Sequence, residues 1–298
     1  MIPRAIVGLD RWLSRQNPAY RPVSQNKNQR PQNLSVGDFR GIMIIANYHT
    51  HTTRCRHGYG ADEEFVQEAL RNNLQILGFS DHTPYFFPGD YYSTMRMYPE
   101  ELEGYSASIL SLQEKYKDQI QIHLGLEVEY YPDLLDRLLS FTRNAGIEYM
   151  ILAQHWCGNE VGESYAGFHT DDLKMPQRYC DQVIEAMETG LFSYVAHPDL
   201  LNFDADPDLY AFHMHRLCQA AKRLDIPLEI NLLGLRTKRQ YPNELFWKIA
   251  GEVGCKAVFG SDAHKPEDLV HPEVIAEAKA MVQKYDLTLL DTVPLRHI

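Results

Sequence analysis

The stretch Ile42-Met43-Ile44-Ile45-Ala46-Asn47-Tyr48-His49-Thr50-His51 decides how this chain is read. Its first half is apolar and β-branched, which predicts a buried strand over Ile42–Ala46. His49 and His51 then stand where a strand ends and a loop begins, and residues two apart in extended backbone point to the same side. Two imidazoles on one side can share a divalent cation. An isolated His-x-His pair is usually a surface or structural feature. The prediction of a metal site therefore depends on whether other strand ends also carry ligand-type side chains.

Outward from this stretch, apolar strand-like runs alternate with helical patterns. The predicted strands are Ile42–Ala46, Leu74–Ser80, Ile120–Gly125, Ile147–Ala153, Phe192–Ala196, Ile226–Ile230 and Lys256–Gly260. The predicted helices are Asp62–Asn73, Glu100–Tyr116, Asp133–Asn144, Met175–Thr189, Tyr210–Leu224, Asn243–Val253 and Pro272–Lys284. Such alternation indicates parallel strands with right-handed crossovers. Without a glycine-rich nucleotide loop, the pattern predicts an α/β fold, a closed seven-stranded (β/α)7 barrel of the TIM type, rather than an open doubly wound sheet.

Length and composition separate two regions. The 298 residues, 44% of them hydrophobic, suffice for two domains or one large barrel. Residues 1–40 are rich in Arg, Asn, Gln and Pro and lack sustained periodicity, which predicts a poorly packed N-terminal extension. A partner-docking arm and a start-site artefact are the alternatives. The barrel domain is expected to span residues 41–298.

Charge and cysteine content exclude several classes of protein. The formal net charge of −11 argues against binding along nucleic acid, which requires basic surfaces. The chain contains no run of eighteen apolar residues and no apolar signal-peptide core, so neither a membrane span nor secretion is expected. Its five cysteines form no C-x-x-C pair, which fits reduced thiols and a cytoplasmic location.

Ligand-type side chains stand at or just after the predicted strands. In parallel α/β barrels, catalytic groups gather at the carboxyl ends of the strands. Seven histidines and two acids are candidate metal ligands there: His49, His51, His57, His82, Glu127, His155, His197, Asp262 and His264. Packing imidazoles and carboxylates together costs desolvation unless a cation compensates. Nine ligands are too many for one ion and suit two or three, and the resulting cationic site favours hydroxide and phosphate.

The combined set of motifs, over roughly residues 42–265, resembles the polymerase-and-histidinol-phosphatase (PHP) family. The set comprises H-x-H, a downstream His-Gly, S-D-H, G-x-E, a lone strand-end His, A-H-P and S-D-A-H. The segments Asp81–Pro84, Met95–Met97, Gly125–Tyr130 and Glu229–Arg236, followed by Tyr241-Pro242, resemble the histidinol-phosphatase branch. The resemblance implies a distorted seven-stranded barrel with a trinuclear centre of zinc, manganese or iron.

The resemblance also implies how the ligands are shared. It assigns the first ion to His49, His51, Glu127 and Asp262, the second to His155 and His197 with Glu127 as a bridge, and the third to His57, His82 and His264. All nine positions are filled. The loop Ala153–Thr170 matches the pattern less clearly, so it is a candidate for shaping substrate choice.

The expected reaction is hydrolysis of a phosphate monoester, most specifically L-histidinol phosphate. Asp262, His264 and Arg236 are the expected catalytic residues, with Arg236 clamping the phosphate because guanidinium matches its oxygens. Arg96 is a second phosphate candidate, and Glu129 is a candidate for a cationic substrate group. Each of these three residues is alternatively structural. Asp81 either orients a ligand imidazole or caps a turn.

Several alternatives stay open. One is a PHP phosphoesterase acting on another small phosphorylated metabolite or nucleotide, and another is a metal-binding module without turnover. An amidohydrolase-type barrel usually needs a strand lysine at the metals, which no predicted strand end offers. The expected partner is a small phosphorylated substrate, with a homo-oligomer as a possibility and neither nucleic acid nor membrane.

Overall fold

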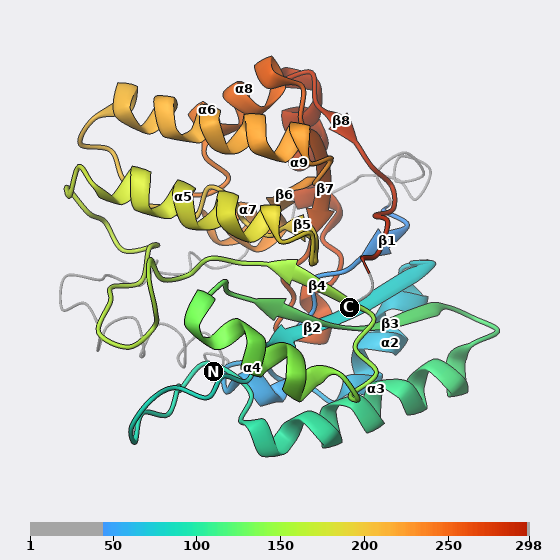
Figure 1. Ribbon diagram of the computed structural model, residues 1–298. Helices are drawn as coiled ribbons and strands as arrows, with labels where there is room; N and C mark the ends of the chain where they lie inside the picture. The colour runs from blue at the N-terminus through green and yellow to red at the C-terminus, as the bar shows by residue number, and fades with distance from the viewer. Residues whose placement is uncertain (1–43, 297–298) are drawn as a thin grey trace, which may run out of the picture.

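The computed structural model describes residues 44–296, so the predicted extension over residues 1–40 lies outside the described part. Eight parallel strands form one sheet, in which each strand pairs with the next along the chain (Figure 1). They are β1 (Ala46–Asn47), β2 (Ile76–His82), β3 (Gln121–Val128), β4 (Tyr149–Leu152), β5 (Phe192–Val195), β6 (Leu228–Asn231), β7 (Lys256–Gly260) and β8 (Thr288–Leu289). The prediction of parallel α/β architecture is confirmed.

The strand count differs from the prediction. The sheet has eight strands rather than seven, because the two-residue strand β8 pairs with the start of β7, at Lys256 and Ala257. The sheet is also curled: an isolated parallel bridge joins Thr50, beyond β1, to Ala263, beyond β7. The amide of His51 donates to the carbonyl of Ala263 at 2.9 Å. The two ends of the seven-strand series therefore meet just past their carboxyl ends.

The helices lie around this sheet, with α3 and α4 below the strands in Figure 1 and α5, α6 and α8 above them. They are α2 (Asp62–Arg71), α3 (Leu102–Tyr116), α4 (Pro132–Thr142), α5 (Met175–Glu188), α6 (Pro207–Arg223), α7 (Leu232–Thr237), α8 (Glu244–Val253) and α9 (Pro272–Lys284). Seven of them match the predicted helices within a few residues. Helix α7 was not predicted because its six residues are too few to show a helical period.

Apolar side chains form two clusters, one on each face of the curled sheet. The larger one packs helices against the outer face and includes Phe65, Tyr105 and Trp247. The smaller one fills the interior below the strand ends and includes Tyr149 and Tyr194.

The ring of Tyr149 on β4 explains the glycines Gly78 on β2 and Gly125 on β3. A Cβ atom on Gly125 would lie 2.3 Å from Cε1 of Tyr149, and one on Gly78 would lie 2.2 Å from its hydroxyl oxygen. That hydroxyl donates to the carbonyl of Tyr48 at 2.7 Å. The glycines thus leave room for one large ring, which closes the barrel interior beneath the strand ends.

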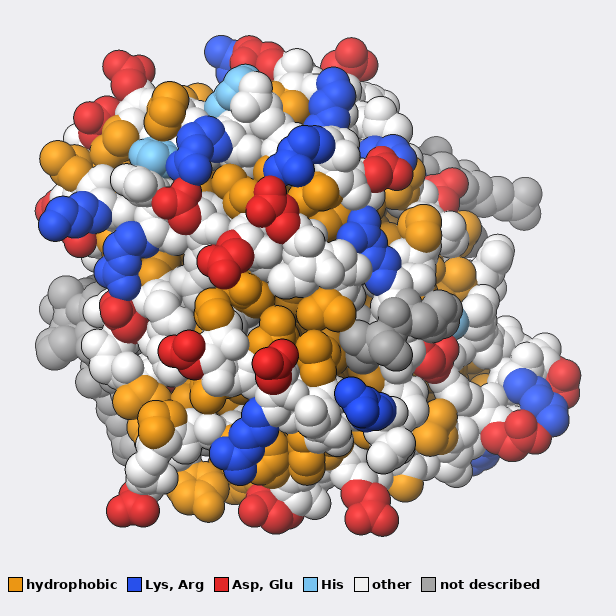
Figure 2. All heavy atoms as spheres, viewed as in Figure 1, with side chains coloured by type: hydrophobic (Ala, Val, Ile, Leu, Met, Phe, Trp, Pro, Cys, Tyr) orange, Lys and Arg blue, Asp and Glu red, His pale blue; other side chains and the backbone are white. Residues whose placement is uncertain are grey.

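The surface carries charges of both signs. On the face shown in Figure 2, Lys and Arg side chains are interspersed with Asp and Glu, without a continuous basic stripe. All five cysteines are free and buried, which confirms the expectation of unpaired thiols. Among the described residues, every helix is too short or too polar to cross a bilayer.

Candidate metal centre and active site

The nine predicted ligands converge at the carboxyl ends of the strands, with Glu127 of β3 in the middle. Its Oε2 lies 2.7 Å from Nδ1 of His82, which ends β2. Its Oε1 lies 2.9 Å from Nε2 of His197, which follows β5, and 3.2 Å from Nε2 of His49. His155, after β4, brings its Nε2 to 3.9 Å from the same oxygen. One carboxylate therefore faces imidazoles from four other strand ends.

Asp262 gathers the imidazoles on the other side of the centre. Its Oδ1 lies 3.2 Å from Nε2 of His51, 3.7 Å from Nε2 of His49 and 3.4 Å from Nδ1 of His264. The ring of His57 stacks on that of His264 with centroids 4.6 Å apart. All nine side chains thus belong to one continuous cluster.

The donor atoms are grouped closely enough to hold metal ions. Several groups of the described residues have ligand atoms within 4.8 Å of one another, among them His49, His51 and Asp262; His49, Glu127 and His197; and His57, His82 and His264. Several buried nitrogen and oxygen atoms lie close to one another but make no hydrogen bond of acceptable geometry: Nε2 of His49, both ring nitrogens of His51, Nδ1 of His82, Oε2 of Glu127, Nδ1 of His197 and Nε2 of His264. Unpaired buried polar atoms are costly, and metal coordination would satisfy them. The residues present therefore fit divalent cations.

Acidic and imidazole groups strongly perturb one another here. Burial would raise the pKa of Glu127, but His82 and His49 hold it well below its ordinary value. Burial disfavours charged His51, yet Asp262 and Asp81 raise its pKa to about 9. Burial and the neighbouring imidazoles lower the pKa of His57 to about 3. The acids thus create a negative potential in which cations are stabilised, either as protons or as metal ions.

Two of the predicted ligands have unusual backbone conformations. His197 has φ 29° and Asp262 has φ 48°, both in the left-handed region that favours glycine. Such strained conformations cluster at functional sites, where the surrounding structure over-determines them. Here the backbone turns sharply after β5 and β7, which places these two side chains beside Glu127 and His51.

Glu229 of β6 supports the centre, a role that the sequence did not reveal. Its Oε1 lies 2.8 Å from Nδ1 of His49, and its Oε2 accepts from the amide of His197 at 3.0 Å and from Asn231 at 2.9 Å. The hydrogen bond at Nδ1 fixes the ring of His49 so that Nε2 faces Glu127. A Cβ atom on Gly260 would lie 1.7 Å from Oε1 of Glu229, so glycine is required beside this carboxylate.

Asp81 and Glu129 also lie behind ligand imidazoles. Oδ1 of Asp81 is 3.5 Å from Nδ1 of His51, and Oδ2 accepts from the amide of Thr52 at 3.2 Å. Oε1 of Glu129 is 2.9 Å from Nδ1 of His155. Together with Glu229, three buried acids surround the ligands, so the centre carries more negative charge than the ligands alone provide.

The residues expected at the substrate differ in their surroundings. Arg96 is buried and donates to Glu129, Glu160 and the carbonyl of Thr83. Its guanidinium is therefore paired within the protein and is not available to a substrate phosphate. Arg236 lies on α7 and bonds Asp268, while burial lowers its pKa to about 10 against the effect of Asp262. These contacts place Arg96 and Glu129 inside the protein and Arg236 near the centre.

Arg239 and Cys55 are further polar residues beside the centre. Arg239 donates to the hydroxyl of Tyr241 at 2.9 Å, and the ring of Tyr241 lies 5.9 Å from that of His197. Cys55 lies among potential ligand atoms of His51 and His264. Burial raises the pKa of Cys55 well above its ordinary value, and its Sγ donates to the carbonyl of Thr52 at 3.0 Å.

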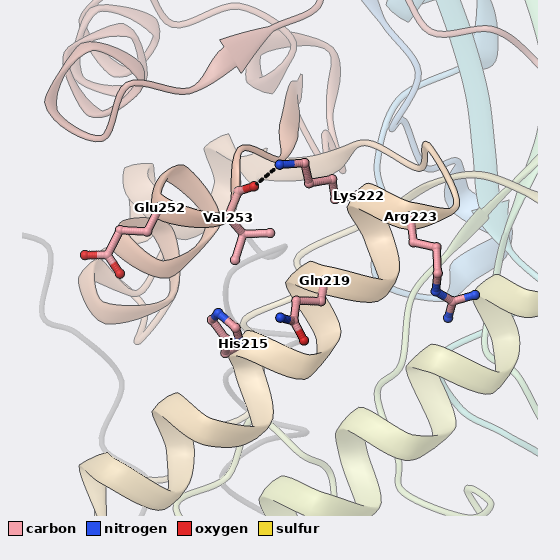
Figure 3. A pocket seen from close by; sticks show the side chains of 6 residues that line it. All are labelled: His215, Gln219, Lys222, Arg223, Glu252 and Val253. Carbon is pink, nitrogen blue, oxygen red and sulfur yellow. Dashed lines mark hydrogen bonds between the residues drawn. The ribbon is translucent and has the colours of Figure 1, made fainter.

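A surface hollow elsewhere is unrelated to this chemistry. It lies between α6 and α8 and is lined by His215, Gln219, Lys222, Arg223, Glu252 and Val253 (Figure 3). Lys222 is engaged with the carbonyl of Val253 at 2.6 Å, and Arg223 bonds Glu188 at 2.8 Å. None of the nine predicted ligands lines it.

Comparison with known proteins places this geometry in a family. The PHP domain matches residues 47–232. A protein of Deinococcus radiodurans named "Probable histidinol-phosphatase" is 30% identical over 76% of this chain and 88% of its own length. The "Histidinol-phosphatase" of Bacillus subtilis is 25% identical over 74% of this chain and 94% of its own.

A solved structure shares the fold. The histidinol phosphate phosphatase of Lactococcus lactis, complexed with zinc, L-histidinol and phosphate, superposes with a TM-score of 0.65 at 18% identity, covering 85% of this chain and 99% of that one. The domain match spans most of the barrel and includes seven of the nine ligands. On this sequence match and on the convergence of the ligands, the chain is a member of the PHP domain family.

Proposed function

We propose that this protein is a metal-dependent histidinol-phosphatase, which hydrolyses L-histidinol phosphate to L-histidinol and phosphate. The observation that carries the proposal is the convergence of nine imidazole and carboxylate side chains from six strand ends. The names of the relatives from Deinococcus radiodurans and Bacillus subtilis supply the substrate.

Three ions fit the donor groups. His49, His51, Glu127 and Asp262 would hold the first, His155 and His197 with Glu127 the second, and His57, His82 and His264 the third. Zinc, manganese and iron all accept imidazole and carboxylate ligands. Bound divalent ions supply Lewis acidity toward phosphoryl oxygens and lower the pKa of water.

The protein's own residues orient the reactants. Glu229 and Glu129 hold His49 and His155 by their Nδ1 atoms, which keeps the opposite ring nitrogens directed at Glu127. Arg236 is the proposed phosphate clamp: Asn231 caps its helix by accepting from Gly234 at 2.9 Å and also donates to Asp262 at 3.1 Å. This anchoring fixes the helix that carries the guanidinium relative to the centre. Asp262 and His264 complete the proposed catalytic set.

The assay is phosphate release by the purified protein, supplied with manganese, zinc or iron, from L-histidinol phosphate and from a panel of other monoesters. We expect a clear preference for L-histidinol phosphate. Equal rates with arbitrary monoesters would remove the substrate assignment and leave a general phosphatase. A metal-loaded protein that hydrolyses no monoester would refute the enzymatic assignment.

Individual ligands are tested by substitution. His51→Ala removes a side chain whose two ring nitrogens lack other partners, so we expect lower metal content and loss of activity. His123→Ala is the matched control. Nδ1 of His123 lies 2.7 Å from Oε2 of Glu148, and this pair lies outside the candidate metal centre. A His51→Ala protein with full metal content and full activity would contradict the ligand assignment.

A further inference from the structure

A buried ionic cluster joins the loops that follow β2 and β4, beside the candidate metal centre. The cluster consists of Arg96, Glu129 and Glu160, whose exposed fractions are 1%, 0% and 6%. Arg96 makes two parallel bonds of 2.9 Å to Glu129. Its Nε donates to Glu160 at 2.9 Å, and its Nη1 also donates to the carbonyl of Thr83 at 3.1 Å.

The cluster carries an excess of one negative charge, because two carboxylates face one guanidinium. Every N–H of Arg96 is already used by Glu129, Glu160 or Thr83, so the guanidinium has no remaining donor for a phosphate. The second oxygen of Glu160 accepts from the hydroxyl of Tyr91 at 2.8 Å, a neutral group. The excess charge is therefore not cancelled within the cluster.

Aromatic rings surround this charge, and one of them keeps an unused polar atom. The guanidinium of Arg96 lies 5.5 Å from the ring of Tyr85 and 5.9 Å from that of Trp156. Tyr131 packs on Tyr85 with centroids 5.1 Å apart, and its hydroxyl is buried without a hydrogen-bond partner. A negative charge in an apolar surrounding acts strongly on nearby cations, because little water screens it.

The cluster is separated from the metal centre by a single imidazole. Glu129 contacts Nδ1 of His155 at 2.9 Å, and Nε2 of the same ring faces Glu127. The proposed phosphate site and the cluster thus lie on opposite sides of the His155 ring. The two neighbouring regions have opposite preferences, one for an anion at the ions and the other for a cation.

We infer that the Arg96–Glu129–Glu160 cluster is a specificity determinant, which selects phosphate monoesters that carry a cationic group a few bonds from the phosphate. The inference rests on the proposed phosphatase function and extends it to a substrate class. Arg96 and Glu160 act as positioning residues: they hold the loops together and set the charge, without contacting the phosphate.

The test uses Glu160→Gln in the full-length, metal-loaded protein. Glutamine keeps the size of the side chain, and its oxygen still accepts from Arg96 while its amide donates to the Tyr91 hydroxyl. Only the excess charge is removed. The matched control is Glu163→Gln, which makes the same charge change in the same loop at an exposed pair with Arg178, 2.9 Å apart.

Two probes separate the effect of the cluster's charge from that of phosphate binding. The cationic probe is L-histidinol phosphate, which carries an ammonium group, and the neutral probe is 2-phenylethyl phosphate, whose organic part carries no charge. We expect Glu160→Gln to lower kcat/KM for the cationic probe roughly tenfold, mainly through KM, and to leave the neutral probe within about twofold. Because the cluster is buried, added salt should change this effect little. Metal content should equal that of the wild type, and Glu163→Gln should change neither probe.

Equal losses on both probes, or no loss on either, would overturn the inference. Glu160→Asp provides a second measurement should Glu160→Gln fail to fold: it keeps the excess negative charge and should keep the wild-type preference for the cationic probe, and loss of that preference would contradict the inference. Failure of the proposed function can be distinguished from failure of this inference. If another cationic monoester outperforms L-histidinol phosphate and Glu160→Gln abolishes that preference, the inference holds while the histidinol assignment falls. A wild type without preference for cationic monoesters overturns both.

Discussion

Gly260→Ala should damage the metal centre without touching any ligand. The new Cβ atom would lie 1.7 Å from Oε1 and 2.5 Å from Cδ of Glu229, so the carboxylate must move by more than 1 Å. That movement disrupts its bonds to His49, to the amide of His197 and to Asn231. Hydrogen bonds to a charged group contribute about 1.5–3 kcal/mol each. Loss of two of these three bonds therefore costs about 3–6 kcal/mol, which overlaps the range of about 3–5 kcal/mol for breaking a buried charged pair.

Thermal unfolding and metal analysis measure this effect. A loss of this size should lower Tm by about 10 °C in a domain of this length. Metal affinity should fall about 10–100-fold, because the ring of His49 loses its orientation. Gly104→Ala is the control: it lies in α3 with no heavy atom within 4 Å of its Cβ position, and should stabilise the protein by about 0.5–1 kcal/mol. A Gly260→Ala protein with wild-type Tm and metal affinity would refute the role of Glu229.

Three further predictions concern the metals, the barrel interior and pH. Chelation should lower Tm, because the predicted ligand atoms lose the metal ions that satisfy them, and added divalent metal should restore it. An unchanged Tm would contradict the metal assignment. Tyr149→Phe should cost about 1–3 kcal/mol in urea unfolding, because its hydroxyl bonds the carbonyls of Tyr48 and Phe79, while activity per folded molecule should be retained. Burial opposes the ionisation of Glu148, but His123 holds its pKa below the ordinary 4.5. The stabilisation that ionised Glu148 provides is present above pH 4.5 and is lost as the pH falls through the lowered pKa of Glu148. The unfolding free energies of the wild type and of Glu148→Gln should therefore converge at low pH.

The convergence of the predicted ligands could be foreseen because each lies at or just beyond the end of a strand, and parallel strands in a barrel bring their carboxyl ends together. His49 and Asp262 illustrate this, since they are far apart in sequence and 3.7 Å apart in the structure. The helices were predictable where their apolar period runs over several turns, as in α6 and α8. The two-residue strand β8 has no such pattern, and it forms only because β7 offers an edge.

The supporting residues were less predictable, because their roles depend on distant partners. Glu229 lies 180 positions from His49, and no local pattern joins them. Arg96 has the chemistry of a phosphate ligand, but the structure surrounds it with Glu129 and Glu160. Sequence distinguishes poorly between an arginine that faces a substrate and one that is neutralised internally, since both follow a strand and precede a helix.

The contact between His51 and Ala263 has a consequence for how activity is acquired. This hydrogen bond links an early segment of the chain to one translated more than two hundred residues later, and Asp262 and His264 arrive with the later segment. A nascent or truncated chain that ends before this point would lack two ligands and the link that closes the ring of strands. We therefore expect that the proposed set of ions can bind only when synthesis of the barrel is nearly finished.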